Sequence, residues 1–124
     1  MQRVTTLKQY SEAAQSTCLD TSKNFTYLML GLMAEVGEVA DLVAKQRRRG
    51  EAFVKDDYLT FNTSHEEVAQ IKKNEIAKEL GDVLWFVALL SEYLGVPFEE
   101  LANRNVAKLA ERKKNNEIIN HKDH

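Results

Sequence analysis

The sequence predicts an all-α fold of four helices, completed by association of several copies of the chain. Apolar residues recur at three- to four-residue spacing in four stretches, and the chain contains one proline and five glycines, so long helices are allowed. The segment 83–90 is apolar on every side, and such a helix must be covered all round. Three other helices of a 124-residue chain leave part of it bare, so we expect a subunit interface.

The first two predicted helices cover residues 6–16 and 24–49. Thr6 and Gln9 have the spacing of a capping box at the start of the first helix. The second helix ends in a basic turn before Gly50, a residue that commonly stops helices. Its apolar residues fall on one face, which consists of Leu28, Leu32, Val36, Val39 and Val43.

The third helix is predicted to begin near Ser64, whose spacing to Glu67 fits a second capping box, and to end at Gly95. The fourth runs from Pro97, a favoured first helical residue, to about Lys114.

Two segments fall outside this helical pattern. Residues 50–64 lack helical periodicity and are expected to form a loop, and residues 115–124 are expected to form a polar tail. We therefore predict one helical domain over residues 1–114, followed by that tail.

Composition excludes several functional classes. With 17 Lys and Arg residues against 19 Asp and Glu, the net charge is −2, which argues against a nucleic-acid-binding protein. The single cysteine, Cys18, excludes a disulfide framework and a cysteine-based zinc site. No signal-peptide pattern and no membrane-spanning apolar run is found, so we expect a cytoplasmic protein without a membrane partner.

Four acidic residues on the second and third predicted helices are candidates for a functional site. Each helix carries an acidic pair at three-residue spacing, which places both members on one helix face. Glu35 lies seven residues from both Leu28 and Leu42, and Glu79 lies four before Val83, so carboxylates stand where the pattern predicts apolar residues. The four acids are Glu35, Glu38, Glu79 and Asp82.

These acids predict a metal site. Converging carboxylates repel one another, and a hard divalent cation with oxygen ligands offsets that repulsion. Mg²⁺ fits best, because it takes a few carboxylates together with water and phosphate oxygens, and Mn²⁺ is an alternative. A di-iron centre fits less well, since it needs Glu-x-x-His pairs and neither acidic pair contains a histidine. The histidines of the chain are His65, His121 and His124. The competing interpretation is that the acids flank the stripe and pair with lysine or arginine.

Further charged residues lie close to this pattern in the sequence. Glu75 precedes Glu79 by one turn and is either a further metal ligand or a solvated partner of Lys72. On the fourth helix one face carries a polar and basic strip that either holds a triphosphate or is simply solvated. That strip consists of Asn105, Lys108 and Arg112.

The segment from Leu28 to Asp41, which contains Glu-Val-Gly-Glu, resembles the first signature of the MazG-like, all-α nucleoside triphosphate pyrophosphohydrolases. The segment from Glu79 to Trp85 resembles the second. The resemblance covers roughly residues 25–49 and 75–112, and the order of the motifs matches. Asn105, Lys108 and Arg112 resemble the family's residues on the fourth helix.

This resemblance implies a four-helix core, assembled as dimers or tetramers, that hydrolyses a nucleoside or deoxynucleoside triphosphate to the monophosphate and pyrophosphate with Mg²⁺. It implies that one of the pair Glu35 and Glu38 also orients or deprotonates the attacking water. Lys108 and Arg112 would hold the phosphate chain, and Asn105 the sugar or phosphate. The implied metal ligands are Glu35, Glu38, Glu79 and Asp82.

Two alternatives stay open: a narrow dUTP or dCTP pyrophosphatase of the same superfamily, and a non-catalytic helical interaction module. The stretch 50–64 and the tail depart from the family pattern, so the preferred base and sugar are open as well. Candidates for stacking on the base are Phe25, Tyr27, Phe53, Tyr58 and Phe61.

Overall fold

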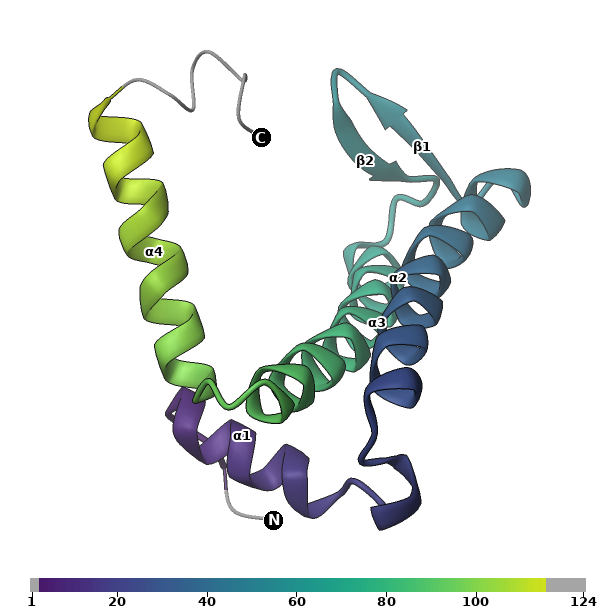
Figure 1. Cartoon of the computed structure of the whole chain (residues 1–124). Coiled ribbons are helices and arrows are strands. Elements are labelled where there is room, and N and C mark those ends of the chain that lie inside the picture. Colours follow the sequence, from purple (N-terminus) through teal and green to yellow (C-terminus); the bar gives the residue numbers. More distant parts are fainter. Residues whose placement is uncertain (1–2, 116–124) are drawn as a thin grey trace. The chain divides into compact units, whose positions relative to one another are not determined.

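The computed structural model describes residues 3–115 and divides the chain into two compact units. One unit combines the chain before Asn24 with the chain from Ala88 onward, and the other is Asn24–Val87 (Figure 1). The predicted all-α class is confirmed, with little strand. The elements are α1 (Leu7–Ser16), a 3₁₀ turn (Asp20–Ser22), α2 (Phe25–Arg48), β1 (Ala52–Lys55), β2 (Tyr58–Phe61), α3 (Glu66–Tyr93) and α4 (Phe98–Lys114).

Local sequence signals set the beginnings of the first two long helices. The predicted capping box of α1 is present: the Thr6 hydroxyl accepts from the backbone N–H of Gln9, and the Gln9 side chain accepts from the backbone N–H of Thr6, both at 3.1 Å. At the start of α2 the Asn24 side chain accepts from the backbone N–H of Tyr27 at 2.9 Å. These bonds satisfy backbone donors that the first turn of a helix leaves unpaired.

The two predicted glycine stops are also confirmed. Gly50 follows α2 and Gly95 follows α3, with φ of 72° and 78°, a conformation that side chains with a Cβ rarely adopt. After α2 the backbone N–H of Glu51 donates to the carbonyl of Gln46 at 2.8 Å, and α3 ends with the equivalent bond. Both ends are therefore Schellman motifs.

The other two helix starts differ slightly from the prediction. α3 begins at Glu66, because the carbonyl of His65 already accepts from the N–H of Ala69 at 3.2 Å. Ser64 is thus one residue too early to form the predicted capping box with Glu67. Pro97 is the N-cap of α4 and not its first helical residue.

The prediction of a loop over residues 50–64 was wrong, because strands β1 and β2 form an antiparallel hairpin there. Asp56 and Asp57 form its two-residue turn, with φ of 52° and 64°, as a type I′ turn requires. Ala52 pairs with Phe61, and both are buried where the hairpin joins the end of α2. The Glu51 carboxylate, just before β1, pairs with the Lys72 ammonium of α3 at 2.8 Å.

The unit that contains α1 and α4 is held together around one carboxylate. Glu92, near the end of α3, accepts from the Ser11 hydroxyl of α1 at 2.8 Å and from the backbone N–H of Phe98 at 3.2 Å. It therefore supplies the N-terminal cap that Pro97 cannot. The Tyr10 and Phe98 rings pack beside it, with centroids 6.1 Å apart. The buried apolar residues here are Ala14, Cys18, Ala88, Leu89, Leu90 and Phe98.

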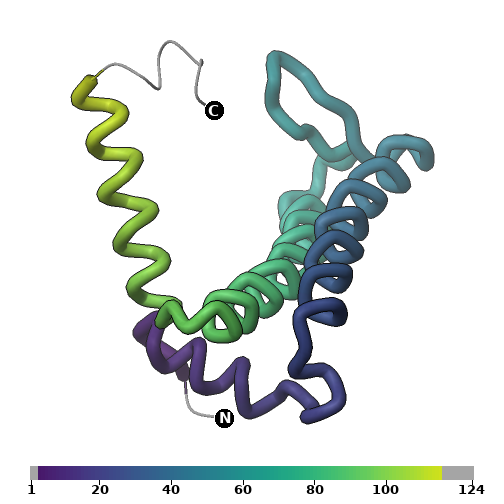
Figure 2. The backbone as a smooth tube through the Cα atoms, viewed as in Figure 1, coloured from purple at the N-terminus to yellow at the C-terminus, as the bar shows by residue number. Residues whose placement is uncertain are grey.

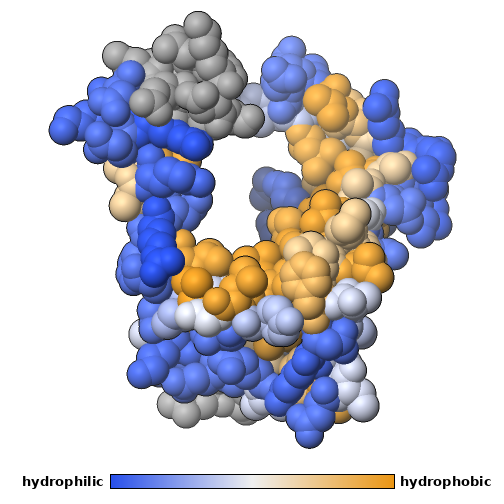
Figure 3. Space-filling model, in the orientation of Figure 1, coloured by the Kyte–Doolittle hydropathy of each residue, from blue (hydrophilic) through white to orange (hydrophobic). Residues whose placement is uncertain are grey.

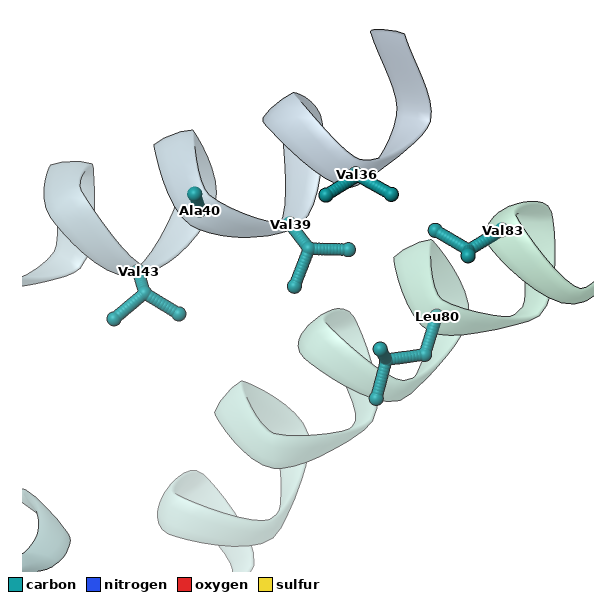
Figure 4. A pocket seen from close by; sticks show the side chains of 6 residues that line it. All are labelled: Val36, Val39, Ala40, Val43, Leu80 and Val83. Atoms are coloured by element: carbon teal, nitrogen blue, oxygen red, sulfur yellow. The ribbon is translucent and has the colours of Figure 1, made fainter. Parts of the chain in front are cut away.

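The unit Asn24–Val87 is a layer of two helices joined by the hairpin. α2 runs up to the hairpin and α3 returns from it (Figure 2). Apolar side chains gather on the exposed surface over these helices (Figure 3). Between the helices lies an open apolar groove of about 540 Å³, in which Val39 and Val83 point toward the space between the ribbons (Figure 4). Its walls are Val36, Val39, Ala40, Val43, Leu80 and Val83.

This groove lacks a covering layer within the unit. Val36 is 52% exposed and Leu80 is 53% exposed, although Val36 lies on a helix face that the sequence pattern marks as buried. A single helical layer leaves apolar surface in water, and stable folds place a second layer over it. Among the described residues no single helix has both the length and the apolar character of a membrane span.

We predict that Glu92→Ala lowers the free energy of unfolding by about 1–3 kcal/mol, because two donors lose a shared, part-buried acceptor. Chemical denaturation followed by circular dichroism measures this change. The matched control Glu12→Ala, at an exposed position of α1, should change it by less than about 0.5 kcal/mol. Equal effects of the two variants would contradict the role assigned to Glu92.

Candidate functional site

Three of the predicted acids converge in the unit Asn24–Val87. Glu35 of α2 and Glu79 and Asp82 of α3 each direct one carboxylate oxygen to a common point, and these oxygens lie within 4.8 Å of one another. Glu35 and Glu79 are half-buried, whereas Asp82 is exposed. Glu79 and Asp82 share one face of α3 because they are three residues apart. The group therefore combines two helices that are distant in sequence.

The electrostatics of this group are unfavourable in the protein alone. Burial raises the pKa of the Glu35 carboxyl above its ordinary value, and the charges of Asp82, Glu79 and Glu38 raise it further. Within residues 3–115, none of the ion pairs closer than 4 Å involves these three acids. No lysine or arginine of the described residues therefore offsets their mutual repulsion through an ion pair.

The competing interpretation, in which the acids serve only structure, requires that they pair with a lysine or an arginine. Lys72, the partner considered for Glu75, instead pairs with Glu51. Glu75 accepts a long hydrogen bond of 3.5 Å from the amide of the buried Gln46. Lys72 therefore forms its ion pair with Glu51 and not with any of the three converging acids.

Comparison with known proteins identifies the family. A family model described as "MazG nucleotide pyrophosphohydrolase domain" matches residues 23–116. The chain belongs to the MazG family. The "Gene 37 protein" of Mycobacterium phage L5 is 32% identical over 111 residues, which span 84% of this chain and 85% of that protein. No solved structure gives a significant match.

Membership in the MazG family confirms the resemblance read from the two acidic signatures, and both lie inside the matched residues. The fourth predicted acid, Glu38, is exposed on α2 and does not belong to the group whose oxygens meet within 4.8 Å. Its charge still acts on Glu35. Its role as a metal ligand stays a prediction.

A small pocket of about 260 Å³ adjoins the acids in this MazG domain. Two of the acids, Glu35 and Asp82, line it together with three aromatic residues. The Tyr27 and Phe86 rings lie 5.9 Å apart and tilted, and the Trp85 and Phe86 rings lie 4.9 Å apart, edge to face. Sequence reasoning included Tyr27 among five stacking candidates but not Trp85 and Phe86, which it assigned to an apolar run, with Trp85 also ending the second family signature.

The predicted residues of α4 belong to the other unit. Asn105 and Lys108 are exposed and line a depression of about 350 Å³ together with Val96, Leu101 and Arg104. Arg112, one turn beyond Lys108, is half-buried. Arg104 was not predicted as a member of this set. It pairs with Glu100 at 3.1 Å. The tail after Asn115, including His121 and His124, lies outside the described residues.

We predict that Glu35→Gln leaves the metal-free protein as stable as the wild type or more stable at neutral pH. The folded state raises the pKa of Glu35 above 4.5, so folding favours the protonated form. As the pH rises through 4.5 and then through the raised pKa, the wild type loses stability relative to the variant. Thermal melts in chelator across this range measure the difference.

Well below pH 4.5 Glu35 is protonated in both states, so the advantage of the variant should disappear. Glu12→Gln removes one exposed negative charge elsewhere and should reproduce none of this pH dependence. A Glu35→Gln variant that is less stable than the wild type at neutral pH would show that Glu35 has a stabilising partner.

Proposed function

We propose that this MazG domain is a Mg²⁺-dependent nucleoside triphosphate pyrophosphohydrolase, which converts ribo- or deoxynucleoside triphosphates to monophosphates and pyrophosphate. The observation that carries the proposal is the meeting of three carboxylate oxygens within 4.8 Å of one another, none of which belongs to an ion pair closer than 4 Å in the described part of the chain. Isolated acids are common on helix surfaces. Acids gathered from two helices at half-buried positions are better explained by a bound cation.

The donor set fits a hard divalent cation. All three groups offer carboxylate oxygen, which Mg²⁺ and Mn²⁺ accept, and no described cysteine or histidine belongs to the group. Glu35, Glu79 and Asp82 would hold the cation, with Glu38 as a fourth ligand. Such a cation lowers the pKa of a bound water and neutralises charge on the phosphates.

The residues of the chain then divide the remaining work. One of the pair Glu35 and Glu38 orients the attacking water and accepts its proton. The water oxygen forms the new bond to phosphorus, one P–O–P bond breaks, and pyrophosphate leaves with the electron pair of that bond. On α4, Lys108 and Arg112 hold the phosphate chain and Asn105 binds sugar or phosphate.

We also propose that the active form is a homodimer or homotetramer. The open groove between α2 and α3 is lined almost entirely by aliphatic carbon, and its walls are half exposed. A second copy of the same layer covers this surface and converts two helices into a four-helix core.

The activity is tested by incubating the protein with ribo- and deoxynucleoside triphosphates and measuring pyrophosphate release with and without Mg²⁺. We expect release only with the metal. Glu79→Gln should lower kcat/KM at least about 100-fold, since residues that merely support metal ligands already contribute 10- to 100-fold. Glu12→Gln should retain activity.

Absence of pyrophosphate release from every triphosphate would favour the non-catalytic helical module. Release from dUTP or dCTP alone would establish the narrow pyrophosphatase instead.

The assembly is tested by light scattering at micromolar concentration, where we expect a multiple of the chain mass of 14.2 kDa. Val36→Arg places a charge in the groove and should shift the mass toward that of one chain. Leu19→Arg is a matched control, because Leu19 is also an exposed aliphatic residue but lies outside the groove. A wild type that is a monomer and fully active would contradict the proposed assembly.

A further inference from the structure

The acids of this domain lie between two unlike surfaces. On the side toward the end of α2, the groove walls are valine, alanine and leucine. On the other side, the pocket that contains Glu35 and Asp82 is completed by Tyr27, Trp85 and Phe86. Because we propose that a second copy of the chain covers the groove, a substrate held at the acids extends toward the aromatic rings.

The aromatic side is firmly built. Phe86 is buried and packs directly on the backbone of α2 at Gly31, where a Cβ would overlap the ring atoms Cε1 and Cζ of Phe86. Trp85 lies edge to face against Phe86 at 4.9 Å. The Tyr27 ring packs on the same Phe86 ring, with centroids 5.9 Å apart, yet Tyr27 is 45% exposed. One exposed ring thus rests on a buried support, with the acids beside it.

The spacing along α2 matches an extended ligand. Tyr27 precedes Glu35 by eight residues, which is about 12 Å along the helix axis at roughly 1.5 Å per residue. This separation is about that between the phosphate chain and the base of a nucleotide.

We propose that Tyr27 is the residue on which the nucleobase stacks, with Phe86 as its positioning support; this rests on the proposed function. Of the five aromatic residues that the sequence offered, Tyr27 is the one that shares the described pocket with the acids. Aromatic side chains bind bases through their π faces, which aliphatic groove walls do not offer.

A consequence for the substrate class follows. Apart from the two acids, the residues that line the pocket are the aromatic residues Tyr27, Trp85 and Phe86. Stacking tolerates every base, because all bases have a π face. Tyr27 therefore selects nucleoside triphosphates over inorganic triphosphate while discriminating weakly among bases.

The test uses Trp85, the single tryptophan of the chain, as a built-in fluorescent reporter of this pocket. A nonhydrolysable nucleoside triphosphate analogue and inorganic triphosphate are titrated with Mg²⁺ into the wild type, Tyr27→Leu and Tyr27→Phe. Calorimetry gives affinities independently of fluorescence, and circular dichroism verifies folding. Phe53→Leu is the matched control, since Phe53 is 42% exposed but lies on the hairpin outside the pocket.

We expect the analogue to quench Trp85 and to bind the wild type, Tyr27→Phe and Phe53→Leu alike. Tyr27→Leu should bind the analogue roughly 5- to 100-fold more weakly, the range that loss of one stacked base gives, and should bind inorganic triphosphate as the wild type does. If Tyr27→Leu does not fold, Tyr27→Phe and the comparison of the two ligands on the wild type decide the question, because equal affinity for both excludes a base contact.

Unchanged affinity of Tyr27→Leu for the analogue, or a loss seen with Phe53→Leu instead, would overturn the assignment. Tyr27-dependent binding without pyrophosphate release would support the base site and refute the proposed activity. Equal pyrophosphate release by the wild type and Tyr27→Leu would support the proposed activity and refute the base site.

Discussion

The mutual repulsion of Glu35, Glu79 and Asp82 is the constraint on which the rest of this domain depends. Their oxygens meet within 4.8 Å, and two of the three side chains are half-buried. A fold selected for stability alone would place apolar residues or an ion pair at these points. The sequence keeps three acids there, and such a local cost to stability is typical of functional sites.

The same region also lacks apolar cover. α2 and α3 form one layer, with a 540 Å³ aliphatic groove between them and half-exposed walls. The hairpin buries Ala52 and Phe61 at its base but does not line the groove. The acids and the groove share α2 and α3, and Val36 and Leu80 of the groove are the direct neighbours of Glu35 and Glu79. The proposed assembly surface and the proposed metal site therefore lie on the same two helices.

Much of the backbone was predictable, because its signals are local. Thr6 with Gln9 gave the start of α1, and Gly50 and Gly95 gave two helix ends. The convergence of Glu35 with Glu79 was also anticipated, since carboxylates on apolar stripes must face the same interior. The hairpin was missed because its turn is Asp56-Asp57, without the glycine that usually marks a type I′ turn.

The aromatic pocket was not predictable for a different reason. Phe86 and Gly31 lie on different helices, and nothing in the spacing of either helix indicates that the ring rests on that glycine. Likewise, the two acids have the same spacing pattern in the sequence, yet Glu35 is half-buried in the acid group whereas Glu38 is exposed outside it. Pairwise tertiary contacts decide both features.

The central claim is that these acids form a cation site, and the melting temperature of the wild type tests it most directly. The protein should be melted in chelator, in MgCl₂, and in NaCl of equal ionic strength. A cation that binds only the folded state raises the melting temperature. We expect a rise with MgCl₂ well above that with NaCl, and a much smaller difference for Glu79→Gln. Identical curves in the two salts for the wild type would contradict the account.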